Sequence, residues 1–162
     1  MITDFVLDNS ALAPVLLLLV VVVCVVLGYL ALRFRRQDPA PVLWILAVLS
    51  TLPVVALTLI PTTARVDGVT CVTRLALPAM GRVELLANVA LLLPLVFFAA
   101  LATRRPLLTV VAGSGVSIAI EAAQAVLPVI GRACDSNDWA MNTAGAVIAG
   151  LLARAVIART TR

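Results

Sequence analysis

Five apolar stretches separated by short polar segments dominate the sequence. A helix needs about 20 residues to cross a hydrocarbon layer about 30 Å thick, and every stretch has roughly that length. The pattern therefore predicts an all-α, polytopic membrane protein, with about five transmembrane helices in a small bundle. The predicted spans are residues 11–32, 42–60, 84–102, 107–127 and 139–158.

The charges around the first stretch predict the orientation of the chain. Asp4 and Asp8 precede it, whereas a secretory signal carries a basic segment at that place. Arginines follow it and mark its C-terminal end as cytoplasmic under the positive-inside rule. Five spans then leave the N-terminus outside and the C-terminus in the cytoplasm. The arginines expected on the inner side are Arg33, Arg35, Arg36, Arg104, Arg105, Arg154, Arg159 and Arg162.

Composition narrows the chemistry that is open to this chain. It is 63% hydrophobic and 12% charged, and it contains no His. Sites that use His to bind metal, and Ser/His/Asp or Cys/His catalysis, are therefore excluded. The net charge of +4 does not indicate nucleic acid, because the arginines fall between apolar stretches and form no stripe. We expect lipid contacts, no nucleic acid and no cofactor or metal, and the oligomeric state stays open.

Polar side chains recur on one face of each of the last three stretches, near the outer end. Spacings of three or four residues return to the same helical face. At 1.5 Å per residue, Glu121 lies about 10 Å below the outer end of its helix, and Asn88 and Asn142 lie about 6 Å below theirs. They predict a polar pocket in the outer leaflet, covered by the loop before the last stretch. The predicted binding residues are Asn88, Glu121, Gln124, Arg132, Asp135, Asp138 and Asn142.

Glu121 is the most informative of these residues, because a charge inside the membrane costs about 2.5–3.5 kcal/mol on insertion scales. A partner such as Arg132, a water-filled cavity or protonation would offset that cost. The alternative is a neutral Glu121 that hydrogen-bonds another helix. Asn88, Gln124 and Asn142 fit a ligand site and equally fit interhelical hydrogen bonds, which are worth about 0.6–2 kcal/mol.

Other residues of these helices and loops have more than one interpretation. Asp138 begins the last stretch, where a carboxylate caps free N–H groups or serves a site. Arg132 either forms a surface ion pair or binds phosphate or carboxylate through its planar fork. Residues 75–80, in the first outer loop, are apolar enough to lie at the interface or to enter the membrane briefly. The small residues interpreted as close-packing positions are Gly113, Ser117, Gly145, Ala149 and Gly150.

The three cysteines differ in their predicted surroundings. Cys71 and Cys134 fall in the two outer loops, and Cys24 falls inside the first stretch. If the outer side is oxidising, a disulfide between Cys71 and Cys134 would hold the long loop over the polar pocket. The alternative is two unpaired thiols. Without His, a catalytic thiol is disfavoured.

The order and spacing of several short motifs resemble the VanZ-like family of bacterial membrane proteins. The resemblance implies a multi-pass protein of the bacterial cytoplasmic membrane, and the founding member is linked to resistance to glycopeptides, notably teicoplanin. It covers about residues 43–158, so we divide the chain into an N-terminal helix with its basic turn, 1–40, and a VanZ-like domain, 41–162. The motifs are Leu57 to Pro61, Asn88 with Pro94, Glu121-x-x-Gln124, and Arg132-x-x-Asp135-x-x-Asp138-x-x-x-Asn142-x-x-Gly145.

Two functions remain in competition at this point. The favoured one is a non-enzymatic envelope or resistance factor that binds an envelope lipid, a cell-wall precursor or a lipophilic drug. The alternative is a hydrolase or transferase for a lipid-linked substrate, with Glu121 or Asp138 as acid or base and Arg132 stabilising negative charge. In that case Glu121, Asp135 and Asp138 could also hold a divalent cation. A transporter is disfavoured, because the inner halves of the spans are almost uniformly apolar.

Overall fold

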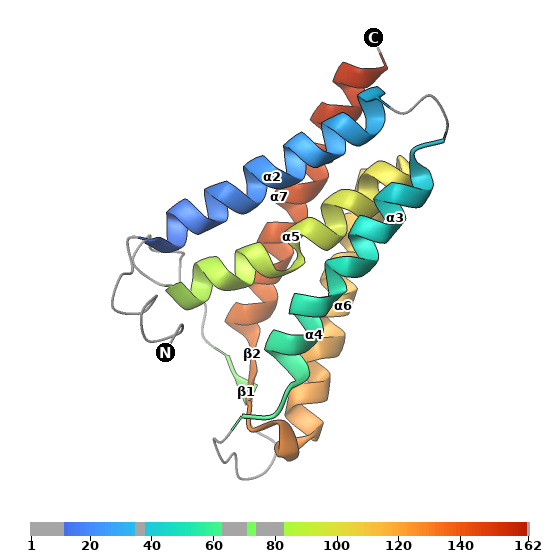
Figure 1. Cartoon of the computed structure of the whole chain (residues 1–162). Coiled ribbons are helices and arrows are strands. Elements are labelled where there is room, and N and C mark those ends of the chain that lie inside the picture. The colour runs from blue at the N-terminus through green and yellow to red at the C-terminus, as the bar shows by residue number, and fades with distance from the viewer. Residues whose placement is uncertain (1–11, 35–37, 63–70, 74–82, 162) are drawn as a thin grey trace.

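The computed structural model describes residues 12–34, 38–62, 71–73 and 83–161 (Figure 1). The apolar piece at 75–80 lies outside these ranges. The helices are α2 (Leu12–Phe34), α3 (Ala40–Leu49), α4 (Thr51–Leu59), α5 (Val83–Thr103), α6 (Pro106–Val126) and α7 (Ser136–Thr160). A 3-10 turn, Pro128–Ile130, and two short strands, β1 (Cys71–Val72) and β2 (Cys134–Asp135), complete the described structure.

Five helical segments are long and apolar enough to cross a membrane, which confirms the predicted all-α bundle. Helices α3 and α4 together form one of them, residues 40–59. Between the two, Ser50 keeps the helical connection, because its N–H and its hydroxyl both donate to the carbonyl of Leu46. Pro53, in the first turn of α4, has no N–H to donate to the carbonyl of Leu49, so one helical hydrogen bond is missing where α3 ends and α4 begins.

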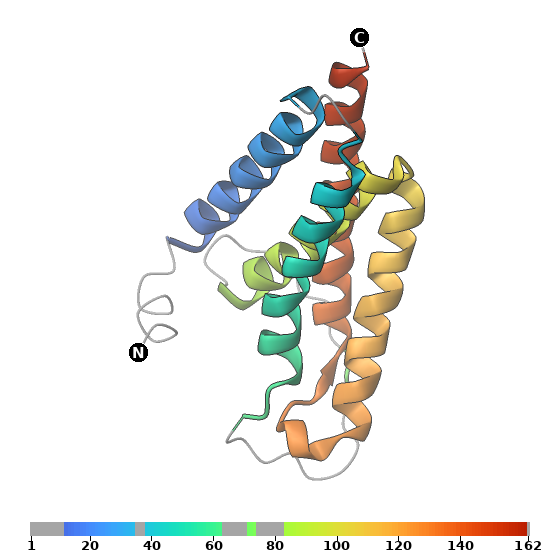
Figure 2. The ribbon, with the colours of Figure 1, turned by 45° about the vertical axis from the view of Figure 1, so that its right-hand side comes forward.

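Helix α5 lies at the centre of the bundle, in contact with α7, α3, α2 and α6 (Figures 1 and 2). Half of its most apolar window is buried, compared with 11% for α2. Leu92, Leu93 and Phe97 on α5 are fully buried and form the middle of the core. The other helices expose many large apolar side chains, as expected where lipid is the solvent.

Glycines allow α7 and α6 to approach their neighbours closely. A Cβ at Gly145 of α7 would overlap the carbonyl oxygen of Val89 on α5, so no larger residue fits there without movement. A Cβ at Gly113 would lie 2.6 Å from a methyl group of Val96. The interpretation of these two glycines as close-packing positions is confirmed.

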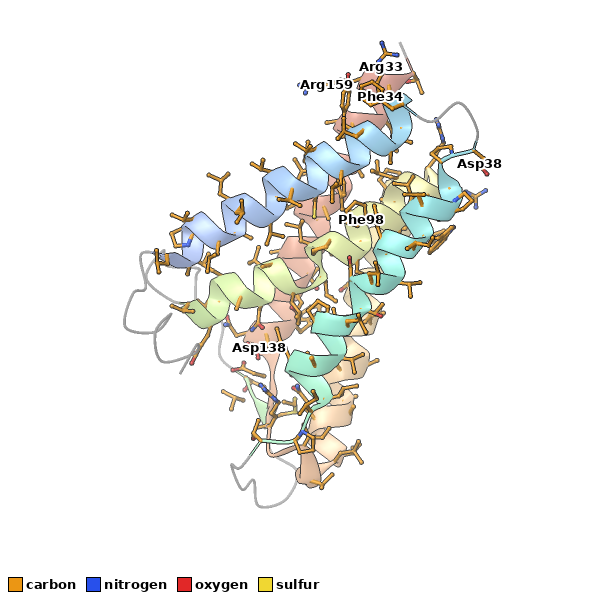
Figure 3. All side chains as sticks on the ribbon, viewed as in Figure 1. Arg33, Phe34, Asp38, Phe98, Asp138 and Arg159 are labelled. Carbon is orange, nitrogen blue, oxygen red and sulfur yellow. A yellow bond between two sulfur atoms is a disulfide. The ribbon has the colours of Figure 1, made fainter. Side chains whose placement is uncertain are left out.

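The bundle has two chemically different ends. At one end lie the C-termini of α2 and α7, with Arg33 and Arg159, and the start of α3, with Asp38 nearby (Figure 3). The strands β1 and β2 and the 3-10 turn lie at the opposite end (Figure 1). The candidate site lies at this second end, which we call the strand end.

Candidate functional site

A two-residue parallel strand pair organises the strand end. Cys71 of β1 pairs with Cys134 of β2, and Val72 pairs with Asp135. A disulfide joins the two cysteines, whose Cα atoms are 4.5 Å apart. The segment before α5 is thereby held against the segment before α7.

A second connection ties the end of α4 to the 3-10 turn. The N–H of Thr62 donates to the carbonyl of Ile130 at 3.0 Å. Its hydroxyl donates to the carbonyl of Gly131 at 2.9 Å. Gly131 has a φ of 67°, a left-handed conformation that glycine adopts without steric cost. This turn directs the chain from α6 into β2.

Glu121 receives a hydrogen bond from the backbone of β2. The N–H of Asp135 donates to Oε2 of Glu121 at 2.7 Å, and Glu121 is only 8% exposed. Asp135 has an extended backbone, and its own carboxylate accepts the N–H of Asn137 at 2.8 Å. This is N-cap geometry. The capping residue of α7 is therefore Asp135, and the interpretation of Asp138 as the cap is wrong.

Asp138 instead joins α7 to α5. Its Oδ1 accepts a hydrogen bond from the side-chain amide of Asn88. Asp138 also interacts electrostatically with Asp135, Glu84 and Arg132. Asn88 and Asp138, which the sequence analysis assigned to one pocket from separate segments, are in direct contact.

Two polar atoms at this end are buried without a hydrogen-bond partner among the described residues. They are Nε of Arg132 and Oδ1 of Asn142. The amide nitrogen of Asn142 donates to the hydroxyl of Ser117 at 3.1 Å, and Asn142 is 2% exposed. One guanidinium nitrogen and one amide oxygen are thus left with unused hydrogen-bonding capacity.

A hollow of about 210 Å³ lies beside Glu121, between α6, α7 and the strand pair. Only two of the seven predicted binding residues, Glu121 and Asp135, line it. Trp139 also lines it, and its indole N–H donates to the hydroxyl of Ser114 at 3.2 Å. The sequence analysis did not select Trp139, although a tryptophan at a helix end is typical of the membrane interface. The lining residues are Cys71, Val72, Thr73, Ile118, Glu121, Cys134, Asp135, Ser136 and Trp139.

Comparison with known proteins identifies the family of this chain. A protein-family model described as VanZ/LLP1 matches residues 15–158. The chain belongs to the VanZ/LLP1 family. The match begins inside α2, whereas the motif resemblance began at about residue 43. Searches against curated proteins and against solved structures found no significant match.

Gln124, one of the polar residues of the VanZ-like motifs, forms its hydrogen bond away from Glu121 and Asp138. Gln124 donates to the backbone carbonyl of Thr58 at 3.0 Å and so joins α6 to α4. The hydroxyl of Thr58 is used within its own helix, where it donates to the carbonyl of Val54. Gln124 therefore has an interhelical hydrogen bond, and it does not line the hollow beside Glu121.

The acidic residues of this VanZ-like protein do not assemble into a metal-ligand set. Within the ranges that the structure describes, no group of three or more Asp, Glu, Cys or His residues is placed to hold a metal ion. The suggestion that Glu121, Asp135 and Asp138 jointly hold a divalent cation is therefore wrong. The side chain of Asp135 is directed to the helix cap, and that of Asp138 to Asn88.

Proposed function

We propose that this VanZ-like protein binds an envelope lipid, a cell-wall precursor or a lipophilic drug at the outer leaflet and contributes to glycopeptide resistance. The observation that carries the proposal is the pair of buried, unpartnered polar atoms on Arg132 and Asn142. An unsatisfied buried polar atom costs about 1–3 kcal/mol, and more when the group is charged. A ligand that supplies an anionic oxygen to Arg132 and a donor to Asn142 would offset this cost.

The hydrogen bonds of the two central carboxylates favour binding over catalysis. Glu121 accepts the N–H of Asp135, and Asp138 accepts the amide of Asn88. Both carboxylates thus hold helices and strands in place around the unpartnered groups. No contact among the described residues singles out either carboxylate as an acid or base for a hydrolase or transferase, so binding is the function that we propose.

The distribution of arginines supports an outer location for the strand end. Arg33 and Arg159 lie at the opposite end of the bundle (Figure 3). Under the positive-inside rule that end faces the cytoplasm. In this orientation the strand end, with Arg132 and the disulfide, faces outward, where an oxidising environment maintains disulfides.

Cysteine labelling in intact cells tests this orientation. We expect Val129→Cys, at a position 75% exposed next to the strand end, to react with a membrane-impermeant maleimide. We expect Asp38→Cys, at the arginine-rich end, to react only after the membrane is opened. The native cysteines contribute no background, because Cys71 and Cys134 are bonded and Cys24 is buried. Labelling of Asp38→Cys in intact cells would reverse the orientation.

Glycopeptide susceptibility of a sensitive bacterial host tests the function. We expect the wild-type protein to raise the inhibitory concentration of teicoplanin, and Arg132→Gln and Glu121→Gln to remove most of this protection. Arg132→Gln removes one charged hydrogen bond to the ligand, a loss of about 1.5–3 kcal/mol that weakens binding about tenfold or more. Glu121→Gln instead weakens the hydrogen bond from the N–H of Asp135 that positions the site. Membrane levels of all variants are matched by immunoblot.

The control for this experiment is Asp38→Asn, which also converts a carboxylate to an amide but lies at the opposite end of the bundle. It should protect as well as the wild type. If the wild-type protein gives no protection against any glycopeptide in a host where it reaches the membrane, the resistance role is wrong.

A further inference from the structure

The arginine-rich end of the bundle, opposite the strand end, carries all but one of the described arginines. Arg33 and Arg159 lie there, near the C-termini of α2 and α7 (Figure 3). Arg104 and Arg105 form the turn between α5 and α6, which lies toward the same end (Figures 1 and 2). Arg154, in the last two turns of α7, is exposed as well.

The contacts between α6 and α7 place Arg154 beside the turn that precedes α6. A Cβ at Gly113 of α6 would lie 3.4 Å from the Cβ of Ala146 on α7. Farther along α7, a Cβ at Gly150 would lie 3.6 Å from the carbonyl oxygen of Pro106, the first residue of α6. Arg154 follows Gly150 by about one helical turn and so lies on the same stripe of α7. It is therefore level with the turn between α5 and α6.

The positive charge at this place is not neutralised by the protein. Arg104, Arg105 and Arg154 form no ion pair within the described part of the chain. The acidic residue described at this end is Asp38, whose Oδ1 accepts the N–H of Ala40 at 3.0 Å (Figure 3). The adjoining segments outside the described ranges, 35–37 and 162, contain no Asp or Glu.

A shallow groove begins at these arginines and runs along the start of α6. It has a volume of about 490 Å³ and is lined by Arg105, Pro106, Leu107, Leu108 and Val111. The three large apolar side chains are exposed by 78%, 56% and 63%, and they belong to a segment that crosses the membrane. The groove therefore offers an apolar surface to hydrocarbon, and the arginines lie where the hydrocarbon layer ends.

The backbone of the turn does not by itself favour an arginine. Arg104 has a φ of 53°, in the left-handed region that glycine and asparagine adopt more readily than other residues. An arginine at this position thus adds a charge to the turn although another residue would suit the backbone better.

We propose that this groove holds an acyl chain of an anionic phospholipid whose phosphate is bound by Arg105 and Arg154, with Arg104 adding attraction. Long arginine side chains reach the level of the head groups, and their planar forks bind phosphate oxygens. A zwitterionic phospholipid also has a phosphate, but its cation would lie among the arginines, where like charges repel. The inference does not rest on the proposed function, which concerns the opposite end of the bundle.

Fluorescence quenching by brominated phospholipids tests the inference. The substitutions Trp44→Phe, Trp139→Phe and Leu108→Trp together leave one tryptophan, which lies in the groove. This variant is placed in vesicles of constant composition, made of phosphatidylcholine and phosphatidylglycerol, in which one lipid or the other is brominated. We expect phosphatidylglycerol to associate with the groove about fivefold more tightly than phosphatidylcholine. Adding Arg105→Gln and Arg154→Gln should remove this preference.

Two controls separate a site from the general attraction of a positive surface. Arg33→Gln with Arg159→Gln also removes two charges from the arginine-rich end, but neither residue lines the groove, so the preference should persist. Trp139→Phe alone leaves Trp44 on α3, which is 46% exposed and does not line the groove. Trp44 should show a clearly smaller preference for phosphatidylglycerol.

Arg104→Asn separates lipid binding from folding. Asparagine adopts the left-handed conformation more readily than arginine, so this variant should be at least as stable as the wild type and yet show a weaker preference for phosphatidylglycerol. The inference is overturned if the groove shows no preference, or if the two double variants lower it equally. Weak quenching by both lipids would also overturn it, because protein, such as a second copy of this chain, would then cover the groove.

Discussion

Replacing Gly145 by alanine should destabilise the folded bundle by about 3 kcal/mol, at the upper end of the usual cost of overpacking. The added methyl group meets the carbonyl oxygen of Val89, which belongs to the backbone of α5. A side chain could rotate away, but this backbone is fixed by the core around Phe97. Helices α5 and α7 must therefore separate along the contact that also carries Asn88 and Asp138.

Gly115→Ala is the matched control for this prediction. Gly115 lies on α6, and a Cβ there would meet nothing within 4 Å. Because alanine favours a helix over glycine by about 1 kcal/mol, this variant should be as stable as the wild type or slightly more so. The stabilities of Gly145→Ala and Gly115→Ala are both measured by unfolding with sodium dodecyl sulfate in mixed micelles, followed by circular dichroism. Equal stabilities of the two variants would mean that α5 and α7 are not packed as closely as described.

Removing the disulfide should cost about 2–4 kcal/mol of stability. The bond between Cys71 and Cys134 spans 63 residues, and closing so long a loop restricts the unfolded chain considerably. It also holds β1 beside β2, whose Asp135 donates to Glu121. We therefore expect the double variant Cys71→Ser, Cys134→Ser to unfold at a lower detergent fraction and to lose protection against glycopeptide.

Reduction provides an independent check of the same bond. A reductant should shift the unfolding midpoint of the wild-type protein to that of the double variant, and it should leave the double variant unchanged. Cys24→Ala, which removes the buried free thiol, should retain the full response to reductant. Non-reducing digestion and mass spectrometry should find a peptide joined through Cys71 and Cys134. Two free thiols at these positions in protein from intact cells would contradict the prediction.

The membrane spans were predictable because their length is imposed by the thickness of the bilayer. Each predicted stretch agrees with its helix within a few residues. The largest difference is at α7, which begins at Ser136 and not at residue 139. A hydropathy criterion misses the first turn of this helix because its residues are polar. The turn is nevertheless helical, because the carboxylate of Asp135 caps it by accepting the N–H of Asn137.

The sequence predicted that polar residues from several helices gather at one end of the bundle, but it did not predict their hydrogen-bond partners. Helical spacing assigned Asn88 and Asp138 to one pocket, since each lies close to the predicted outer end of its span. It did not reveal that Gln124 reaches the backbone of Thr58, because the rotation of α6 against α4 depends on packing between the two helices. The backbone donor to Glu121 was also unpredictable, because it depends on β2 being extended at Asp135.

The bond between Cys71 and Cys134 also constrains how the protein is made. It closes a ring that contains α5 and α6 together with the turn between them. The ring can close only after α5 and α6 have both inserted across the membrane, because only then does Cys134 lie on the same side as Cys71. A chain whose hairpin is inserted incorrectly keeps its two thiols in different compartments. The oxidised fraction of newly synthesised protein is therefore a direct measure of how many chains have completed this insertion step.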